Sequence, residues 1–174
     1  MEAINPHGSK HHGEGKIEGS WMGMKKLLEQ DLLCSALRGR VSYHLTRYSK
    51  FGSSGSCASV SLDGQPVKKF GFLYAIAQLS RKGLLAAGQY PWDVPMEARD
   101  EYELWEFTDA LKTFRNQPIT ASVRSGNPII RMFAIVDRRV GKRTLVKLQE
   151  SLSDQPEWLR KLYVARMAAE GIGE

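Results

Sequence analysis

The hydrophobic pattern of this chain changes its period twice, and this change constrains the fold more than any other feature. Between Val41 and Leu45 apolar and polar residues alternate, as in a half-buried strand. The alternation returns in residues 57–62. Asp63-Gly64, which follows, accepts the positive φ angles of a tight hairpin, and residues 66–72 supply the return strand. The pattern predicts a three-stranded antiparallel meander over residues 40–72.

Helical periodicity governs the segments before and after the meander. In the longest of them Leu104, Phe107, Leu111 and Phe114 recur at steps of three and four. Asn127 is expected to cap a later helix that has proline at its first position. The expected helices span residues 22–37, 70–83, 96–115, 118–124, 127–140, about 142–152 and 153–171, with a loop over 86–95.

Strands that are grouped, and not interleaved with helices, indicate an α+β fold. We expect an N-terminal helix, a three-stranded antiparallel meander and a helical C-terminal half, together forming a single domain over residues 21–174. Residues 1–20 are rich in Gly, His, Ser and Lys and lack large apolar side chains. Such a segment cannot offset its ordering entropy, so we expect a disordered tail. His11 and His12 alone make no closed metal site.

The net charge of +6 is distributed unevenly. Residues 24–82 carry ten Lys and Arg against three Asp and Glu, whereas residues 83–115 carry three against seven. This asymmetry permits an anionic partner without requiring one. The candidate nucleic-acid or anion-binding residues fall in two groups, one around the meander and one in a short basic segment. They are Arg38, Arg40, Arg47, Lys50, Lys68 and Lys69, and Arg138, Arg139, Lys142 and Arg143.

The meander cations do not share one face of the expected sheet. Lys68 has the parity of Phe70, whereas Lys69 has the parity of Val67. Tyr43, which could stack on a base, falls on the apolar face with Val41. The meander is therefore a candidate nucleic-acid-binding surface, but the alternation argues against one continuous cationic face.

The basic segment "DRRVGKRTL", residues 137–145, resembles a phosphate-binding loop only superficially. That motif requires glycine five residues before Gly141 and Ser or Thr directly after Lys142, and the chain has Val136 and Arg143 there. It also follows a helix and not a strand. We interpret it as a junction between two helices, in which Gly141 ends the first helix and Arg138 and Arg139 lie at its negative end.

No catalytic constellation is evident. The acidic stretch "EARDEYELWE", residues 97–106, is interpreted as a solvated helix face because its carboxylates recur at helical spacing. Cys57 near His44 would make a thiol dyad, but an exposed histidine and a core thiol are the preferred interpretation. Two cysteines and no secretory signal favour a reduced, cytoplasmic protein. No apolar run is long enough for a membrane span, and we expect no metal and no cofactor.

Four stretches carry a resemblance to a known family: "LRGRVSYHLTRY", "VSLDGQPV", "NPIIRMFAIVDRRVGKRTL" and the closing "AAEGI". They resemble a family of small, uncharacterised bacterial proteins that share a Lys/Leu-rich first helix and an Asp-Gly hairpin. The resemblance covers about Met24 to Ile172. It implies the domain described above and no assigned activity.

Three functions remain open. The preferred hypothesis is a non-catalytic cytoplasmic module that binds another macromolecule, with a protein favoured over nucleic acid. Trp92, Trp105 and Trp158 are its candidate exposed anchors. The alternative is a nucleic-acid-binding protein that uses the cationic meander and the 138–143 segment. The third hypothesis is an enzyme of unrecognised type.

Overall fold

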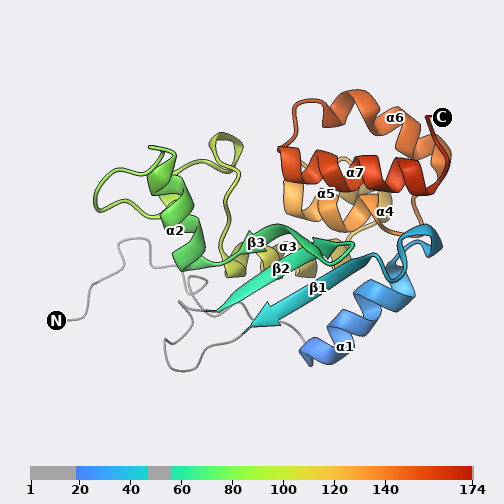
Figure 1. The fold of residues 1–174 in the computed structure, drawn as a ribbon, viewed down its shortest axis with the longest axis horizontal. Helices are drawn as coiled ribbons and strands as arrows, with labels where there is room; N and C mark the ends of the chain where they lie inside the picture. The colour runs from blue at the N-terminus through green and yellow to red at the C-terminus, as the bar shows by residue number, and fades with distance from the viewer. Residues whose placement is uncertain (1–18, 47–55, 174) are drawn as a thin grey trace.

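The computed structural model describes residues 19–46 and 56–173. The prediction of an α+β fold is confirmed: an N-terminal helix precedes three antiparallel strands, and helices form the C-terminal half (Figure 1). The expected disordered tail lies almost entirely outside the described residues. So do Arg47 and Lys50 and most of the expected connection over 51–56.

The sheet is the predicted meander, with strand order β1-β2-β3. Its strands are β1 (Val41–Thr46), β2 (Cys57–Leu62) and β3 (Gln65–Phe70). Tyr43 lies opposite Val60, and both are buried. The hairpin turn has φ 52° at Asp63 and 78° at Gly64, which are the left-handed angles that this pair accepts. A register shift between Val60 and Ser61 leaves Val67 as an extra residue in β3.

The first helix ends earlier than the sequence predicts. Helix α1 (Trp21–Lys26) continues into the wider turns of η1 (Leu27–Leu32), and Leu33 is already extended. The cause is a tertiary contact: Arg138 N donates to Leu32 O at 2.7 Å, and Cys34 N donates to Val136 O at 2.9 Å. The chain therefore leaves the helix to pair with the segment after α5 (Pro128–Ile135), and residues 35–37 form only a single 3-10 turn.

The predicted helix over 96–115 exists only in its second part. A 3-10 turn, η5 (Met96–Ala98), is followed by extended backbone, and α3 (Leu104–Asn116) starts at Leu104. Glu106 determines this start because its Oε2 accepts a hydrogen bond from Glu103 N at 2.8 Å. The acidic residues before Glu103 therefore lie outside the first turn of any long helix.

The other helices follow the predicted order with shifted ends. Asn127 caps α5 as predicted, with its Oδ1 2.9 Å from Ile129 N. The helix ends at Ile135 and not at Val140, and the last helix begins at Glu157. The remaining elements are α2 (Phe72–Arg81), η4 (Pro91–Asp93), α4 (Ile119–Ser122), α5 (Pro128–Ile135), α6 (Lys142–Leu152) and α7 (Glu157–Ala169).

The core is an aromatic cluster between the sheet and the C-terminal helices. Phe107 of α3 contacts Phe70 and Phe133, with ring centroids 5.0 and 5.4 Å apart, and Tyr43 stacks on Phe133 at 5.8 Å. Helix α2 lies apart from this core, at the opposite end of the molecule from α6 (Figure 1). It packs on β3 and η4, where the rings of Tyr90 and Trp92 stack at 4.6 Å.

The segment 137–145 forms a junction whose backbone is held by a buried arginine. Arg166 of α7 donates to the carbonyls of Ile135, Asp137 and Val140 at 3.2, 3.1 and 2.8 Å. The expected role of Gly141 differs from the observed one. Gly141 has φ −84° and precedes α6 as its N-cap, so it begins a helix and does not end one.

Replacing Arg166 with methionine should destabilise the fold strongly. The change leaves three backbone carbonyls without their buried donor, and unsatisfied buried groups of this kind cost about 1–3 kcal/mol each before relaxation. We expect Arg166→Met to lower the free energy of unfolding by about 3 kcal/mol in urea denaturation. Arg143→Met, at an exposed position of the same basic segment, should change it by less than about 0.5 kcal/mol.

Candidate functional site

Most of the predicted cations of the meander are engaged in contacts within the molecule. Arg40 makes a two-point ion pair with Asp63 at 2.8 and 2.9 Å. Arg38 donates to Gln30 O at 3.0 Å. Lys68 is buried, whereas Lys69 is exposed and lies over the ring of Tyr74 at 5.7 Å. The two lysines thus face opposite ways, as their parity predicts.

Cations of the basic segment also make contacts within the molecule. Arg139 pairs with the buried carboxylate of Asp137 at 2.8 Å, and this contact raises the pKa of the guanidinium. Lys142 donates to Glu170 O at 2.8 Å. Of the eight candidates in the described part of the chain, only Arg138 and Arg143 make no such side-chain contact. Six of the eight described candidates are therefore occupied by contacts within the molecule.

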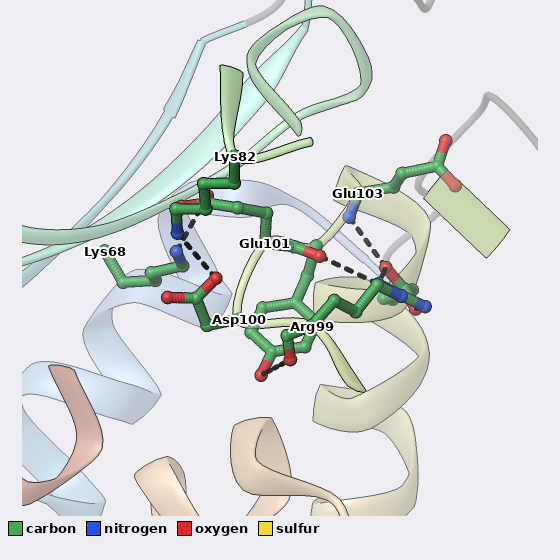
Figure 2. Close-up of polar contacts among 8 residues, drawn as sticks. Lys68, Lys82, Arg99, Asp100, Glu101 and Glu103 are labelled. Carbon is green, nitrogen blue, oxygen red and sulfur yellow. Dashed lines mark hydrogen bonds and ion pairs between the residues drawn. The ribbon is translucent and has the colours of Figure 1, made fainter. Parts of the chain in front are cut away.

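The structure assembles charged groups around residues 99–103, which we call the ionic segment (Figure 2). Arg99 donates hydrogen bonds to both carboxylate oxygens of Glu106, with Nη1 2.9 Å from Oε2. The two side chains are only 4% and 3% exposed. Arg99 also donates to Val94 O and Glu101 O at 2.8 Å each. The charges of Arg99 and Glu106 are therefore paired and hydrogen-bonded, which their burial requires.

A second ion-pair network ties the ionic segment to the sheet. Lys68 of β3 contacts Glu101 at 2.8 Å, and both side chains are 7% exposed. Lys82 contacts Asp100 at 2.6 Å and Glu101 at 3.3 Å. Burial lowers the pKa of Lys68, and the hydrogen bond that Lys68 donates to Glu101 opposes this effect. Burial also tends to raise the pKa of Asp100, but its contacts with Lys82 outweigh this and lower it.

The backbone of the ionic segment runs beside the end of β3. Tyr102 forms a parallel bridge with Phe70, and Gly71 N donates to Tyr102 O at 3.0 Å. Gly71 is needed at this crossing because a Cβ there would lie 2.9 Å from Cys57 Cβ. These contacts overturn the interpretation of residues 97–106 as a solvated helix face. Its central carboxylates, Glu101, Glu103 and Glu106, are buried.

Glu103 differs from the other buried carboxylates because no cation contacts it directly in the described structure. Burial raises the pKa of Glu103 to about 7, and the nearby charge of Glu106 adds to this effect. The hydrogen bond from Trp105 Nε1 at 3.0 Å and the charge of Arg99 oppose it. The carboxylate points away from Arg99 (Figure 2).

Two neighbouring clefts flank the ionic segment. The larger, of about 470 Å³, lies between residues 96–102 and the N-terminal ends of α5 and α7. The smaller, of about 300 Å³, lies between β3, α2 and α7, with Val67, Tyr74 and Trp158 in its walls. Asp100 and Glu157 line both clefts. We therefore describe the two clefts as one groove.

Exposed apolar side chains gather on α2 and the loop after it, and one of them, Tyr74, lines the groove. Four of the seven large ones in the described residues, Leu73, Tyr74, Leu84 and Tyr90, lie on α2 or the loop after it. The predicted tryptophan anchors need correction. Trp158 is buried in the core beside Phe70, and Trp92 and Trp105 are half-buried. No sequence signal marked the groove, because its walls come from segments that are far apart in the sequence.

The considered thiol dyad does not form. Cys57 lies opposite Thr46, and the exposed His44 lies opposite Ser59 and contacts Ser42. Cys34 is a buried thiol whose pKa is raised by burial. Within residues 19–46 and 56–173, no group of His, Cys, Asp and Glu is arranged to hold a metal ion. No helix in the same ranges has the length and apolar character needed to cross a membrane.

These observations define a class of protein: an α+β domain with a groove bordered by buried ion pairs. A model of the SF0329 protein family matches residues 20–167, and the chain belongs to that family. This match spans most of the range over which the sequence resembles a family of uncharacterised proteins. No curated protein and no solved structure matches the chain.

The Arg99–Glu106 pair gives a stability prediction. Arg99→Met leaves the Glu106 carboxylate buried without its cation, which should cost about 3–5 kcal/mol. Adding Glu106→Gln removes the orphaned charge and keeps an acceptor for Glu103 N. The double variant should therefore be more stable in urea than Arg99→Met alone. Lys112→Met, exposed on α3, is the control. A double variant no more stable than Arg99→Met would contradict the pairing.

Glu103 gives a pH prediction. Because the pKa of this carboxyl is raised in the folded state, ionisation costs more there than in the unfolded chain, and stability is lost as pH rises from about 4.5 to 7. Glu103→Gln has no such loss. It should be more stable than the parent by about 2–3 kcal/mol at pH 8, and the advantage should vanish near pH 4.5. Glu150→Gln on the exposed face of α6 should show no pH-dependent difference.

Proposed function

We propose that this protein is a non-catalytic module that binds a segment of another protein in the groove beside the ionic segment. The observation that carries the proposal is the pair of adjacent clefts, of about 470 and 300 Å³, that share Asp100 and Glu157 in their walls. Buried ion pairs fix the ionic segment between them. A site that is ordered before binding loses little entropy when a partner arrives.

The composition of the groove and its rim suits a protein partner. Tyr74 is exposed in the wall of the smaller cleft, and Leu73 and Tyr90 are exposed on α2 and the loop that follows it. Aromatic and apolar side chains of this kind act as anchors in protein interfaces, with polar groups around them. The carboxylates of Glu101 and Glu106 are engaged in ion pairs, which leaves them poorly placed for acid–base chemistry.

A bacterial cytoplasm is the compartment that we propose. Cys34 and Cys57 are both free thiols, which suits a reducing environment. Nucleic-acid binding through Arg138 and Arg143 is the alternative function. Both residues are exposed, but six of the eight described candidate cations are occupied within the molecule. That occupancy is why we favour a protein partner.

Site-specific photo-crosslinking tests the proposed surface. A benzophenone amino acid replaces Tyr74 in the groove, and in a matched variant it replaces Val146, which is exposed on α6 outside the groove. We expect a discrete protein adduct from position 74 in cells and none from position 146. Equal labelling from both positions, or no adduct from position 74, would contradict the proposal.

A salt titration tests the alternative function, nucleic-acid binding. Binding to generic DNA and RNA is measured by fluorescence anisotropy from 50 mM salt upward, since counterion release makes such binding fall steeply with salt. We expect no binding at 50 mM. Binding that decreases with salt and is weakened by Arg138→Gln with Arg143→Gln would instead establish the nucleic-acid function.

A further inference from the structure

We infer that Ser151 is a phosphorylation site and that Arg131 holds the phosphoryl group. Ser151 lies in the last turn of α6, and Arg131 lies in the middle of α5. The guanidinium of Arg131 already donates to the backbone carbonyl and to the hydroxyl of Ser151, at 3.3 and 2.8 Å. The inference goes beyond the proposed function and does not depend on it.

Arg131 carries a buried charge that no carboxylate of the described chain neutralises. Three arginines are buried in the described residues. Arg99 pairs with Glu106, and Arg166 pairs with Glu170 at 3.0 Å. Arg131 is only 6% exposed, and burial lowers the pKa of its guanidinium with no opposing contribution from a nearby carboxylate. A buried cation without a counter-charge is costly, which points to an anion that the unmodified chain does not supply.

One edge of the Arg131 guanidinium is only half occupied. Its Nη2 donates to Ser151 Oγ, whereas its Nε is buried and has no acceptor. Arg40 and Arg139 show what this edge holds when it is filled, because in each of them Nε and Nη2 donate to the two oxygens of one carboxylate. A single hydroxyl oxygen cannot fill both positions. A phosphoryl group on that hydroxyl brings further oxygens beside Nη2 and can complete the two-point contact.

The position of Ser151 favours a covalent phosphoryl group over a free anion. Ser151 is exposed, and its Oγ donates to Leu148 O at 2.9 Å while it accepts from Arg131. The last turn of a helix frays, so the hydroxyl can be presented to an enzyme. The Nε of Arg131, in contrast, is closed to solvent. A phosphoryl group reaches it from Oγ, whereas a free ion would first have to displace Ser151.

The modification is a phosphoryl transfer from a nucleoside triphosphate, catalysed by a protein kinase. Ser151 Oγ forms a bond to the γ-phosphorus, and the bond between that phosphorus and the bridging oxygen breaks to release the nucleoside diphosphate. A base of the kinase takes the hydroxyl proton. The product places a charge of about −1.5 to −2 at pH 7 beside the guanidinium of Arg131. The new charge also lies close in sequence to Asp154, which lines the larger cleft.

Phosphoserine encoded at position 151 or 153 of the full chain tests the contact. Ser153 is the matched control, because it is exposed at the same end of α6 and its Oγ contacts only Glu150 O, at 2.7 Å, in the described structure. Glu150 and Asp154 are near both serines in sequence. Phosphorus NMR should show the phosphate at 151 titrating about one pH unit or more below that at 153, which should stay near about 6. Equal pKa values would overturn the inference.

Variants of the guanidinium assign the effect to Arg131. Arg131→Gln should abolish the pKa difference between the two phosphates, and Arg131→Lys, which keeps the charge without the fork, should retain only part of it. Arg143→Gln, at an exposed position in the first turn of α6, should leave the difference unchanged. In the parent chain, phosphoserine at 151 should also give a Tm about 3 °C or more above that with phosphoserine at 153. This comparison needs no variant of Arg131, and equal Tm values would contradict the contact even if Arg131→Gln unfolds.

Two further measurements establish the source of the phosphoryl group. The protein is purified, with phosphatase inhibitors, from growing and from stationary cells that express it from its own gene, and the tryptic peptide 148–160 is sequenced by mass spectrometry. We expect a phosphoryl group on Ser151, and its absence under both conditions would exclude the modification. The Tm of the unmodified protein is also compared in inorganic phosphate and in chloride at equal ionic strength. We expect no difference. A rise in phosphate that Arg131→Gln removes would assign the site to a free ion and overturn the covalent assignment.

Discussion

The burial of the Arg99–Glu106 ion pair is the constraint on which the rest of this structure depends. Two charges removed from water are tolerated only when they face each other and their remaining donors find acceptors. Arg99 meets this requirement through Glu106, Val94 O and Glu101 O. The geometry leaves residues 99–103 extended and starts α3 at Leu104. It also presents Tyr102 to the end of β3, so that an ionic interaction determines a backbone pairing.

The groove follows from this arrangement. Its inner border is a segment with no regular structure of its own, held by Lys68 from the sheet and Lys82 from the end of α2. The other wall is α7, whose position Arg166 fixes by bonding the turn after α5. Charge pairs that stabilise the fold therefore also keep the two sides of the groove apart. Glu97 and Asp154 line the larger cleft, and Lys69 and Lys161 line the smaller one.

The sequence predicted those parts of the fold whose determinants are local. Asp63-Gly64 indicated the hairpin, and Asn127-Pro128 indicated the start of α5. The error at residues 97–103 has a physical cause. Carboxylates at helical spacing indicate a solvated helix face, and the cations that pair with them in the fold, such as Lys68, are distant in sequence. One local signal was present, since Glu103 and Glu106 have the spacing of a capping box. The groove had no such signal because distant segments form it.

Native-state hydrogen exchange of individual amides tests most directly whether the ionic segment is a fixed part of the fold. Two amides report on it: Gly71 N–H, bonded to Tyr102 O, and Glu103 N–H, bonded to Glu106. Both should exchange only through global unfolding, with the protection of the core amide of Phe107. Exchange of these two amides as fast as that of Gly88 in the exposed loop would mean that the segment opens locally, and a preformed groove would be contradicted.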